Sequence, residues 1–184
     1  GPARARVLLE LGMALAENEG WRGAWAVFEA ARGEAGDDLA RRARIEQNLG
    51  YTWLFRGDLA ASERHARAAL QLAEELQEPR VMAEAFQAYP FVEFLLGRGV
   101  DQEMLDRGIA LEGHLEGEFK SHVLRASFVA AMILKSTDRL DEARRTFTEL
   151  LGDAAAHGVE IPIPEMRYHL AELECRAGNW DAAM

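Results

Sequence analysis

Apolar residues recur along this chain at intervals of three and four positions, which is the period of an amphipathic helix. The first stretch contains Val7, Leu8, Leu11 and Leu15 and is interrupted at Gly20. A second stretch with the same period follows at once: Trp21, Ala24, Phe28 and Ala31. Two helical stretches joined by so short a break predict an antiparallel helical hairpin.

The clearest hairpin lies between residues 48 and 70, with the sequence NLGYTWLFRGDLAASERHARAAL. Gly57 supplies the turn. Four of its positions carry little side chain, namely Gly50, Ser62, Ala66 and Ala69. Small residues at helical spacing let two helix backbones approach closely. A single hairpin buries only part of its apolar surface, so it requires neighbouring copies.

The sequence contains these copies in a regular register. The apolar residues that open the second helix of each hairpin are separated by 38, 41, 40 and 40 positions: Trp21, Leu59, Val100, Leu140 and Trp180. A turn residue stands one or two positions before each of them: Gly20, Gly57, Gly99, Asp138 and Gly178. This repetition predicts an all-α, right-handed α-solenoid of stacked antiparallel hairpins with a period of about 40 residues.

We expect one repeat domain over residues 1–184, with repeats at about 2–36, 37–77, 79–113, 118–157 and a truncated 164–184. Asp37 or Asp38 is an expected N-cap. The third repeat is the least regular: Pro90 interrupts a helical pattern and predicts a kink or break. A short helix is expected from Asp101 to about Glu112, although it contains Gly108.

The order of Leu and small residue, aromatic, turn, apolar residue, Ala, Phe and Ala resembles the tetratricopeptide repeat. Several segments are similar to the sensor region of large ATP-dependent LuxR-type transcription regulators: GDLAASERHARAALQLAEEL, FLLGRGVDQEMLDRGIALE, DRLDEARRTFTELL and LAELECRAGNWDAA. The resemblance implies a tetratricopeptide-like scaffold, with an NTPase module upstream and a helix-turn-helix domain downstream. These motifs belong to the repeat scaffold and name no ligand.

Composition narrows the functional classes. A net charge of −10 argues against direct nucleic-acid contact. Cys175 is the single cysteine, which excludes an intrachain disulfide and fits a reducing cytoplasm. The longest apolar run, from Phe128 to Leu134, is too short to span a membrane. Because the chain begins with Gly-Pro and ends inside an expected helix, we interpret it as an excised piece.

The sequence favours no catalytic residue, metal or cofactor. It has no phosphate-binding Gly-x-x-x-x-Gly-Lys-Ser/Thr loop. Cys175 with His169 as base is disfavoured, because six positions along one helix place them on different faces, and the thiol is expected to be buried or half-buried. His114, Glu118 and His122 are spaced for one helix face, but nearby glycines favour a loop. The segment Arg41-Arg42-Ala43-Arg44 is expected to be a solvated helix face.

The expected binding surface is the concave face formed by the first helices of the repeats. Its candidate residues combine arginine, amide and aromatic groups, a composition found at binding hot spots: Arg6, Met13, Arg44, Gln47, Asn48, Tyr51, Phe55, Arg125, Phe128, Met132, Tyr168 and Glu172. The competing interpretation is that several of them pack against the next repeat.

The sequence therefore predicts a non-catalytic sensor and interaction module that binds a protein domain, a peptide or a small effector, and so biases an NTPase-linked DNA-binding switch. A generic tetratricopeptide scaffold outside transcription is the alternative, and an enzyme comes third. The oligomeric state is left open.

Overall fold

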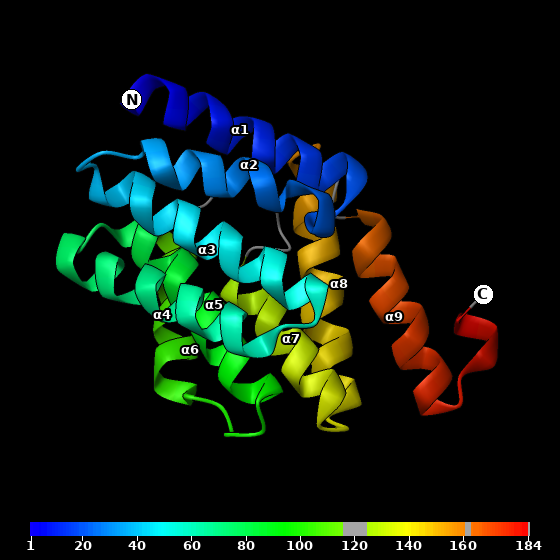
Figure 1. The fold of residues 1–184 in the computed structure, drawn as a ribbon. Coiled ribbons are helices and arrows are strands. Elements are labelled where there is room, and N and C mark those ends of the chain that lie inside the picture. Colours follow the sequence, from blue (N-terminus) through cyan, green and yellow to red (C-terminus); the bar gives the residue numbers. More distant parts are fainter. Residues whose placement is uncertain (116–124, 161–162, 184) are drawn as a thin grey trace. The chain divides into compact units, whose positions relative to one another are not determined.

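The computed structural model describes residues 1–115, 125–160 and 163–183, and the described chain is an all-α solenoid of helical hairpins (Figure 1). It divides into two compact units, Gly1–Leu111 and Glu112–Met184. This confirms the predicted fold class. Each unit is described separately below.

The first unit is built from consecutive antiparallel helices that pack on their neighbours along the chain (Figure 1). Contacts also join α3 to α5, so hairpins stack through their first helices. The bounds are α1 Pro2–Glu19, α2 Trp21–Glu34, α3 Leu39–Arg56, α4 Leu59–Leu76, α5 Pro79–Leu95 and α6 Gln102–His114.

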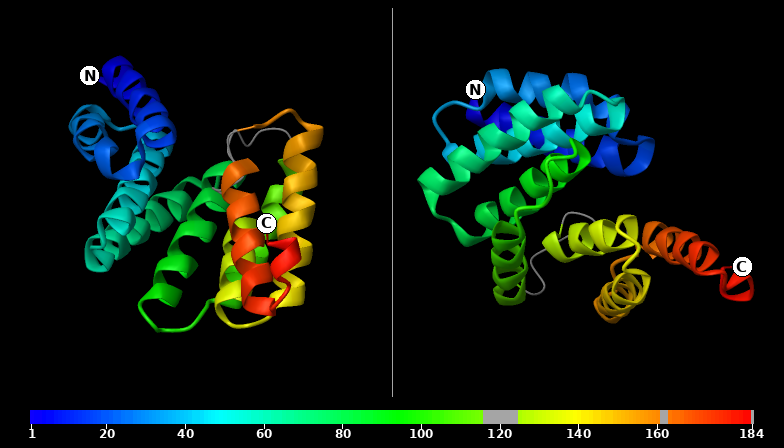
Figure 2. Two further views of the ribbon diagram at one scale, coloured as in Figure 1. Left: turned by 90° about the vertical axis from the view of Figure 1, so that its right-hand side faces the viewer. Right: turned by 90° about the horizontal axis from the view of Figure 1, so that it is seen from below.

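The second unit contains α7 Ala126–Ser136, α8 Leu140–Ala156, α9 Ile163–Ala177 and the 3-10 helix η2 Trp180–Ala182. The helices α7 and α9 both pack against α8 (Figure 2). At its entrance, the carboxylate of Glu112 accepts hydrogen bonds from the backbone N–H of Ala126 and from the hydroxyl of Ser127, the latter at 2.8 Å. These are donors that the first turn of α7 cannot satisfy internally.

The predicted register agrees with the helix starts. α2, α4, α8 and η2 begin at four of the five predicted positions, and α6 begins two residues after Val100. The backbone explains the residues that precede them: φ is positive at Gly20, Gly57, Gly99, Asp138 and Gly178. A left-handed residue lets a helix end within one position, and glycine adopts it without steric cost.

Aspartate side chains fix the start of three helices in the first unit. Asp38 accepts from the N–H of Arg41 at 2.9 Å, Asp58 from Ala61 at 2.8 Å and Asp101 from Met104 at 2.9 Å. Each satisfies one of the free N–H groups in a first helical turn. Of the two caps expected before α3, the structure uses Asp38.

Close helix approach determines the packing of α3 on α4. Gly50, Ser62, Ala66 and Ala69 are all buried, as expected for small contact residues. A Cβ atom on Gly50 would lie 3.5 Å from the backbone nitrogen of Ala66. The Ser62 hydroxyl donates a hydrogen bond of 2.8 Å to the Gly50 carbonyl, which ties the two backbones together.

The structure corrects two expectations about single residues. Of the kink or break predicted at Pro90, the break is absent: α5 continues through Pro90 to Leu95, with the proline ring fully buried. Packing around the buried ring offsets the hydrogen bond that a proline removes from a helix. Cys175 is exposed rather than buried or half-buried, because it lies on the side of α9 away from the buried Met166 and Leu173.

Replacing Gly12 by alanine tests the packing of α1 on α2. The added Cβ would lie 2.5 Å from an atom of the Phe28 ring, which is itself fully buried. Gly50→Ala is the matched control, because its Cβ finds only ordinary contacts. Both variants gain the same helix propensity, so we expect Gly12→Ala to be less stable than Gly50→Ala by about 1–3 kcal/mol. Urea unfolding measures the difference, and equal stabilities would contradict the packing described here.

Candidate binding surfaces

The structure separates the twelve predicted binding residues into two groups. Five of them are buried: Gln47, Asn48, Tyr51, Arg125 and Phe128. The other seven are half-buried or exposed, and they stay predicted contact residues: Arg6, Met13, Arg44, Phe55, Met132, Tyr168 and Glu172.

Burial of the α3 residues results from a polar contact between successive first helices. The Gln47 side-chain amide donates to the Glu84 carbonyl of α5 at 3.1 Å. Gln87, also on α5, donates to the Tyr51 hydroxyl. These amide and hydroxyl groups therefore join the second repeat to the third instead of facing a ligand.

Glu84 is the charged group of this contact. Burial raises the pKa of Glu84, although Arg44 and Arg80 lie close enough to oppose that change. Arg44 Nε is 3.9 Å from one carboxylate oxygen, and Arg80 Nε is 3.3 Å from the other. A buried carboxylate requires such partners. Arg44 thus has a structural contact while a third of its side chain is exposed.

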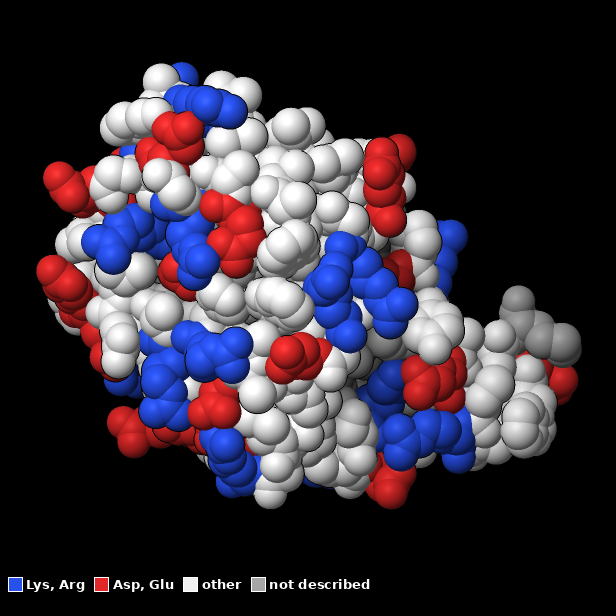
Figure 3. All heavy atoms as spheres, in the orientation of Figure 1, with Lys and Arg blue, Asp and Glu red and all other residues white. Residues whose placement is uncertain are grey.

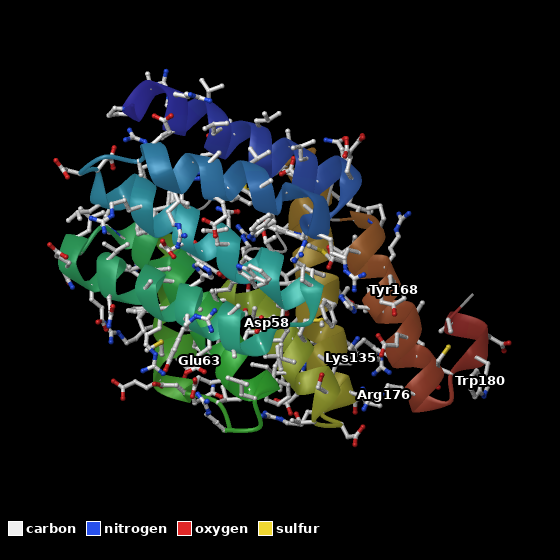
Figure 4. All side chains as sticks on the ribbon, in the orientation of Figure 1. Asp58, Glu63, Lys135, Tyr168, Arg176 and Trp180 are labelled. Carbon is white, nitrogen blue, oxygen red and sulfur yellow. The ribbon has the colours of Figure 1, made fainter. Side chains whose placement is uncertain are left out.

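A second polar contact joins α7 to α9 in the second unit. Lys135, marked in Figure 4, is buried, and its ammonium contacts Glu172 at 2.5 Å and His169 Nδ1 at 3.0 Å. The imidazole of His169 stacks on Phe147 with centroids 5.4 Å apart. Burial, and secondarily the Lys135 charge, lower the pKa of His169 to about 4.

The most accessible aromatic surface of the first unit lies where α2 begins and α3 ends. Phe55 stacks on Trp21 with centroids 6.1 Å apart and remains 46% exposed. Trp25 packs edge-on against Trp53 at 6.0 Å and remains 37% exposed. The Arg56 guanidinium lies over both indole rings, 5.6 and 5.1 Å from their centroids. We call these five residues the aromatic cluster.

Of this cluster, the sequence analysis identified only Phe55 as a binding candidate. Trp21 was interpreted as the residue that opens a helix. The sequence does place the aromatic residues of the cluster within five positions of the turns at Gly20 and Gly57. These two turns belong to successive predicted hairpins, and this proximity could have indicated the cluster. Lys135 was also missed, since nothing local marks a lysine as buried.

A groove of about 490 Å³ is lined by residues of α2, α3 and α4 and shares Trp53 with the aromatic cluster. Trp53 and Ala68 contribute apolar surface to it, and the remaining lining residues are charged or titratable: Glu29, Arg32, Glu46, Arg64 and His65. The residues that form it come from three helices and are separated by up to 39 positions, so no local sequence pattern indicates it.

The other chemical candidates remain apart from these surfaces. Arg41 pairs with Asp38 at 2.7 Å. On the face of the molecule drawn in Figure 3, basic side chains are interspersed with acidic ones. Within the described residues no group of three or more acidic, histidine or cysteine side chains is arranged to hold a metal ion. Of the predicted His114 series, Glu118 and His122 lie outside the described residues.

None of the helices in the described ranges combines the length and apolar character needed to cross a membrane.

Comparison with known proteins places the fold among TPR-like repeats. No family model matches the chain, and no curated protein matches it. Among solved structures, the kinesin light chain-like protein of Podosopora anserina with nearly identical TPR-like repeats is similar at a TM-score of 0.59 and 14% identity, over 100% of this chain and 91% of that one. A variant of the same protein also gives 0.59 and 14%, over 99% and 90%. This similarity establishes the repeat fold.

The buried histidine predicts a specific dependence of stability on pH. The pKa of His169 is about 4 in the folded chain, below its ordinary value of 6.5. Between these two pH values the imidazole is protonated in the unfolded chain and neutral in the folded chain. The contribution is fully present above pH 6.5 and is lost as the pH falls toward 4. The loss is at most about 3.5 kcal/mol at about 1.4 kcal/mol per pKa unit.

Thermal melts between pH 7.5 and 4 compare the wild type with His169→Gln. The variant should show the shallower fall, because a glutamine amide can still accept from Lys135 without titrating. His157→Gln, at the exposed position that follows α8, is the control and should retain the wild-type slope. An unchanged slope in His169→Gln would show that acidic groups such as Glu172, whose pKa the Lys135 ammonium lowers, set the pH dependence instead.

Proposed function

We propose that this chain is a non-catalytic, protein-binding repeat scaffold, whose main contact surface in the first unit is the aromatic cluster. One observation supports this most directly: Phe55 and Trp25 remain 46% and 37% exposed although both rings are held in place by other aromatic side chains. Large rings that are already ordered bind a partner with little loss of side-chain entropy.

The chemistry around the rings strengthens this proposal. Arg22 donates from Nε to the Phe55 carbonyl at 2.6 Å, so the end of α3 is tied to the start of α2. Arg56 covers Trp25 and Trp53 by cation–π contact. Tryptophan, arginine and aromatic residues in one patch are the composition of energetic hot spots in protein interfaces.

At a finer level, we propose that the scaffold is the sensor region of an NTPase-linked transcription regulator of the LuxR type, acting in the cytoplasm. The similarity of its repeat segments to that family supports this assignment. A ligand that binds two arrangements of a regulator equally shifts neither, so the partner must favour one of them. The alternative is a generic interaction scaffold outside transcription, which the fold accommodates equally well.

The reading frame that encodes the chain discriminates between these alternatives. A Walker-type loop upstream together with a helix-turn-helix pattern downstream would select the regulator. Their absence from a complete reading frame would leave the generic scaffold.

Replacing Phe55 by alanine tests the contact surface. Affinity capture with the parent protein, quantified by mass spectrometry, should recover at least fivefold less of a specifically bound partner, because the anchoring ring is lost. Leu95→Ala is the matched control, since Leu95 is a similarly exposed apolar residue at 39% but lies at the end of α5. Both variants must melt near the wild-type temperature. Equal recovery by the two variants, or no enriched protein in either, would contradict the proposal.

A further inference from the structure

The groove between α2 and α4 contains an arginine, Arg64, that no described carboxylate pairs with. Both of its carboxylates already have a partner: Glu29 pairs with Arg32 at 2.8 Å, and Glu46 contacts His65 Nδ1 at 2.7 Å. Arg64, in contrast, is exposed and forms no ion pair with any described acidic residue. Arg64 is therefore a cationic donor of the groove that no described carboxylate engages.

Trp53 adds an apolar surface and a second unpaired donor. Its ring lines the groove, and its indole N–H is buried with no acceptor among the described residues. Leaving a buried donor unpaired is unfavourable, so such groups usually have a hydrogen-bonding or functional reason. On its other side the ring is covered by Arg56, whose guanidinium lies 5.1 Å from the centroid. A cationic ligand on Trp53 would therefore add a like charge near Arg56.

We propose that this groove binds an extended acidic segment of a partner protein, with a glutamate or aspartate side chain on Arg64 and an adjacent apolar side chain against Trp53 and Ala68. An arginine holds a carboxylate through two parallel N–H···O bonds, a geometry that favours carboxylate over a neutral amide. Successive side chains of an extended segment point to opposite sides, so a carboxylate on Arg64 and the neighbouring apolar side chain contact different parts of the groove. Arg32 lies half exposed at the rim, where Glu29 balances its charge, so Arg64 is the arginine that receives the carboxylate.

The dimensions agree with this occupant. About 490 Å³ falls within the range of about 300–1,000 Å³ that ligand sites occupy. The groove lies on the side of α3 that faces α2 and α4, and it uses Trp53 but not Phe55. The groove and the aromatic cluster share Trp53, and the variants Arg64→Gln and Phe55→Ala distinguish them because each residue belongs to one surface alone.

The probe is the acetylated and amidated peptide Glu-Leu-Glu-Leu-Glu, titrated into the protein and followed by calorimetry and by indole N–H signals in NMR spectra. We expect saturable millimolar or tighter binding that shifts the Trp53 signal and leaves that of Trp180 unchanged. Raising the salt concentration should weaken it, because the pair is partly exposed. The chain has four tryptophans, so assignment by single Trp→Phe variants is practical.

Arg64→Gln should weaken binding of this peptide at least fivefold. Arg67→Gln is the matched control on the same helix: Arg67 is exposed, pairs with Glu63 at 2.7 Å and does not line the groove. Losing this exposed pair is worth little to folding. Equal weakening by the two variants would overturn the proposal, because it would show attraction by overall charge.

Three further results would also overturn it. Equal binding of Gln-Leu-Gln-Leu-Gln would remove the carboxylate from recognition, and tighter binding of Lys-Leu-Lys-Leu-Lys would make the groove a cation site. Glutarate binding as tightly as the peptide would indicate a small free dicarboxylate instead of a protein segment. None of these outcomes bears on Phe55, so failure here leaves the proposed function to its own test.

Discussion

The structure depends on one constraint: a hairpin must reverse the chain tightly enough for both of its helices to share a buried face. The described hairpins other than α5–α6 do so within one to three residues. The residues before α2, α4, α8 and η2 meet this constraint with positive φ, at Gly20, Gly57, Asp138 and Gly178. Tight reversal brings α3 and α4 so close that the Ser62 hydroxyl donates a hydrogen bond to the Gly50 carbonyl. Aromatic and aliphatic residues can then fill the remaining space, as Phe28 and Phe147 do.

Stacking of hairpins has a different basis in the two units. Between α3 and α5 the contact is made by amide, hydroxyl and carboxylate groups, and between α7 and α9 by a lysine, a histidine and a glutamate. Buried polar groups must find partners, and each of these finds one on the neighbouring first helix. A surface that would otherwise be open to ligands is partly used for repeat-to-repeat contact, so exposed rings near the turns carry the proposed binding function.

The groove of the first unit results from the same packing of hairpins. Because α2 and α4 are both second helices with α3 between them, their charged side chains border a strip of α3 that includes Trp53. Intrahelical pairing of Glu29 with Arg32 neutralises one edge, whereas Arg64 has no such partner. The two arginines of the groove therefore differ in pairing, and Arg64 is the one that can bind a carboxylate from a partner.

The sequence by itself determined the features that depend on neighbours in the chain. Apolar periodicity located the helices, the turn residues located their ends, and Leu59 and Leu140 began helices at the predicted positions. Only the tertiary structure decided which polar side chains remain available. Gln47 is buried by an acceptor on Glu84, 37 positions away, and Lys135 by Glu172 at the same separation, so their environment is absent from any local pattern. Burial is a property of the packed neighbour, whereas periodicity is a property of the helix itself.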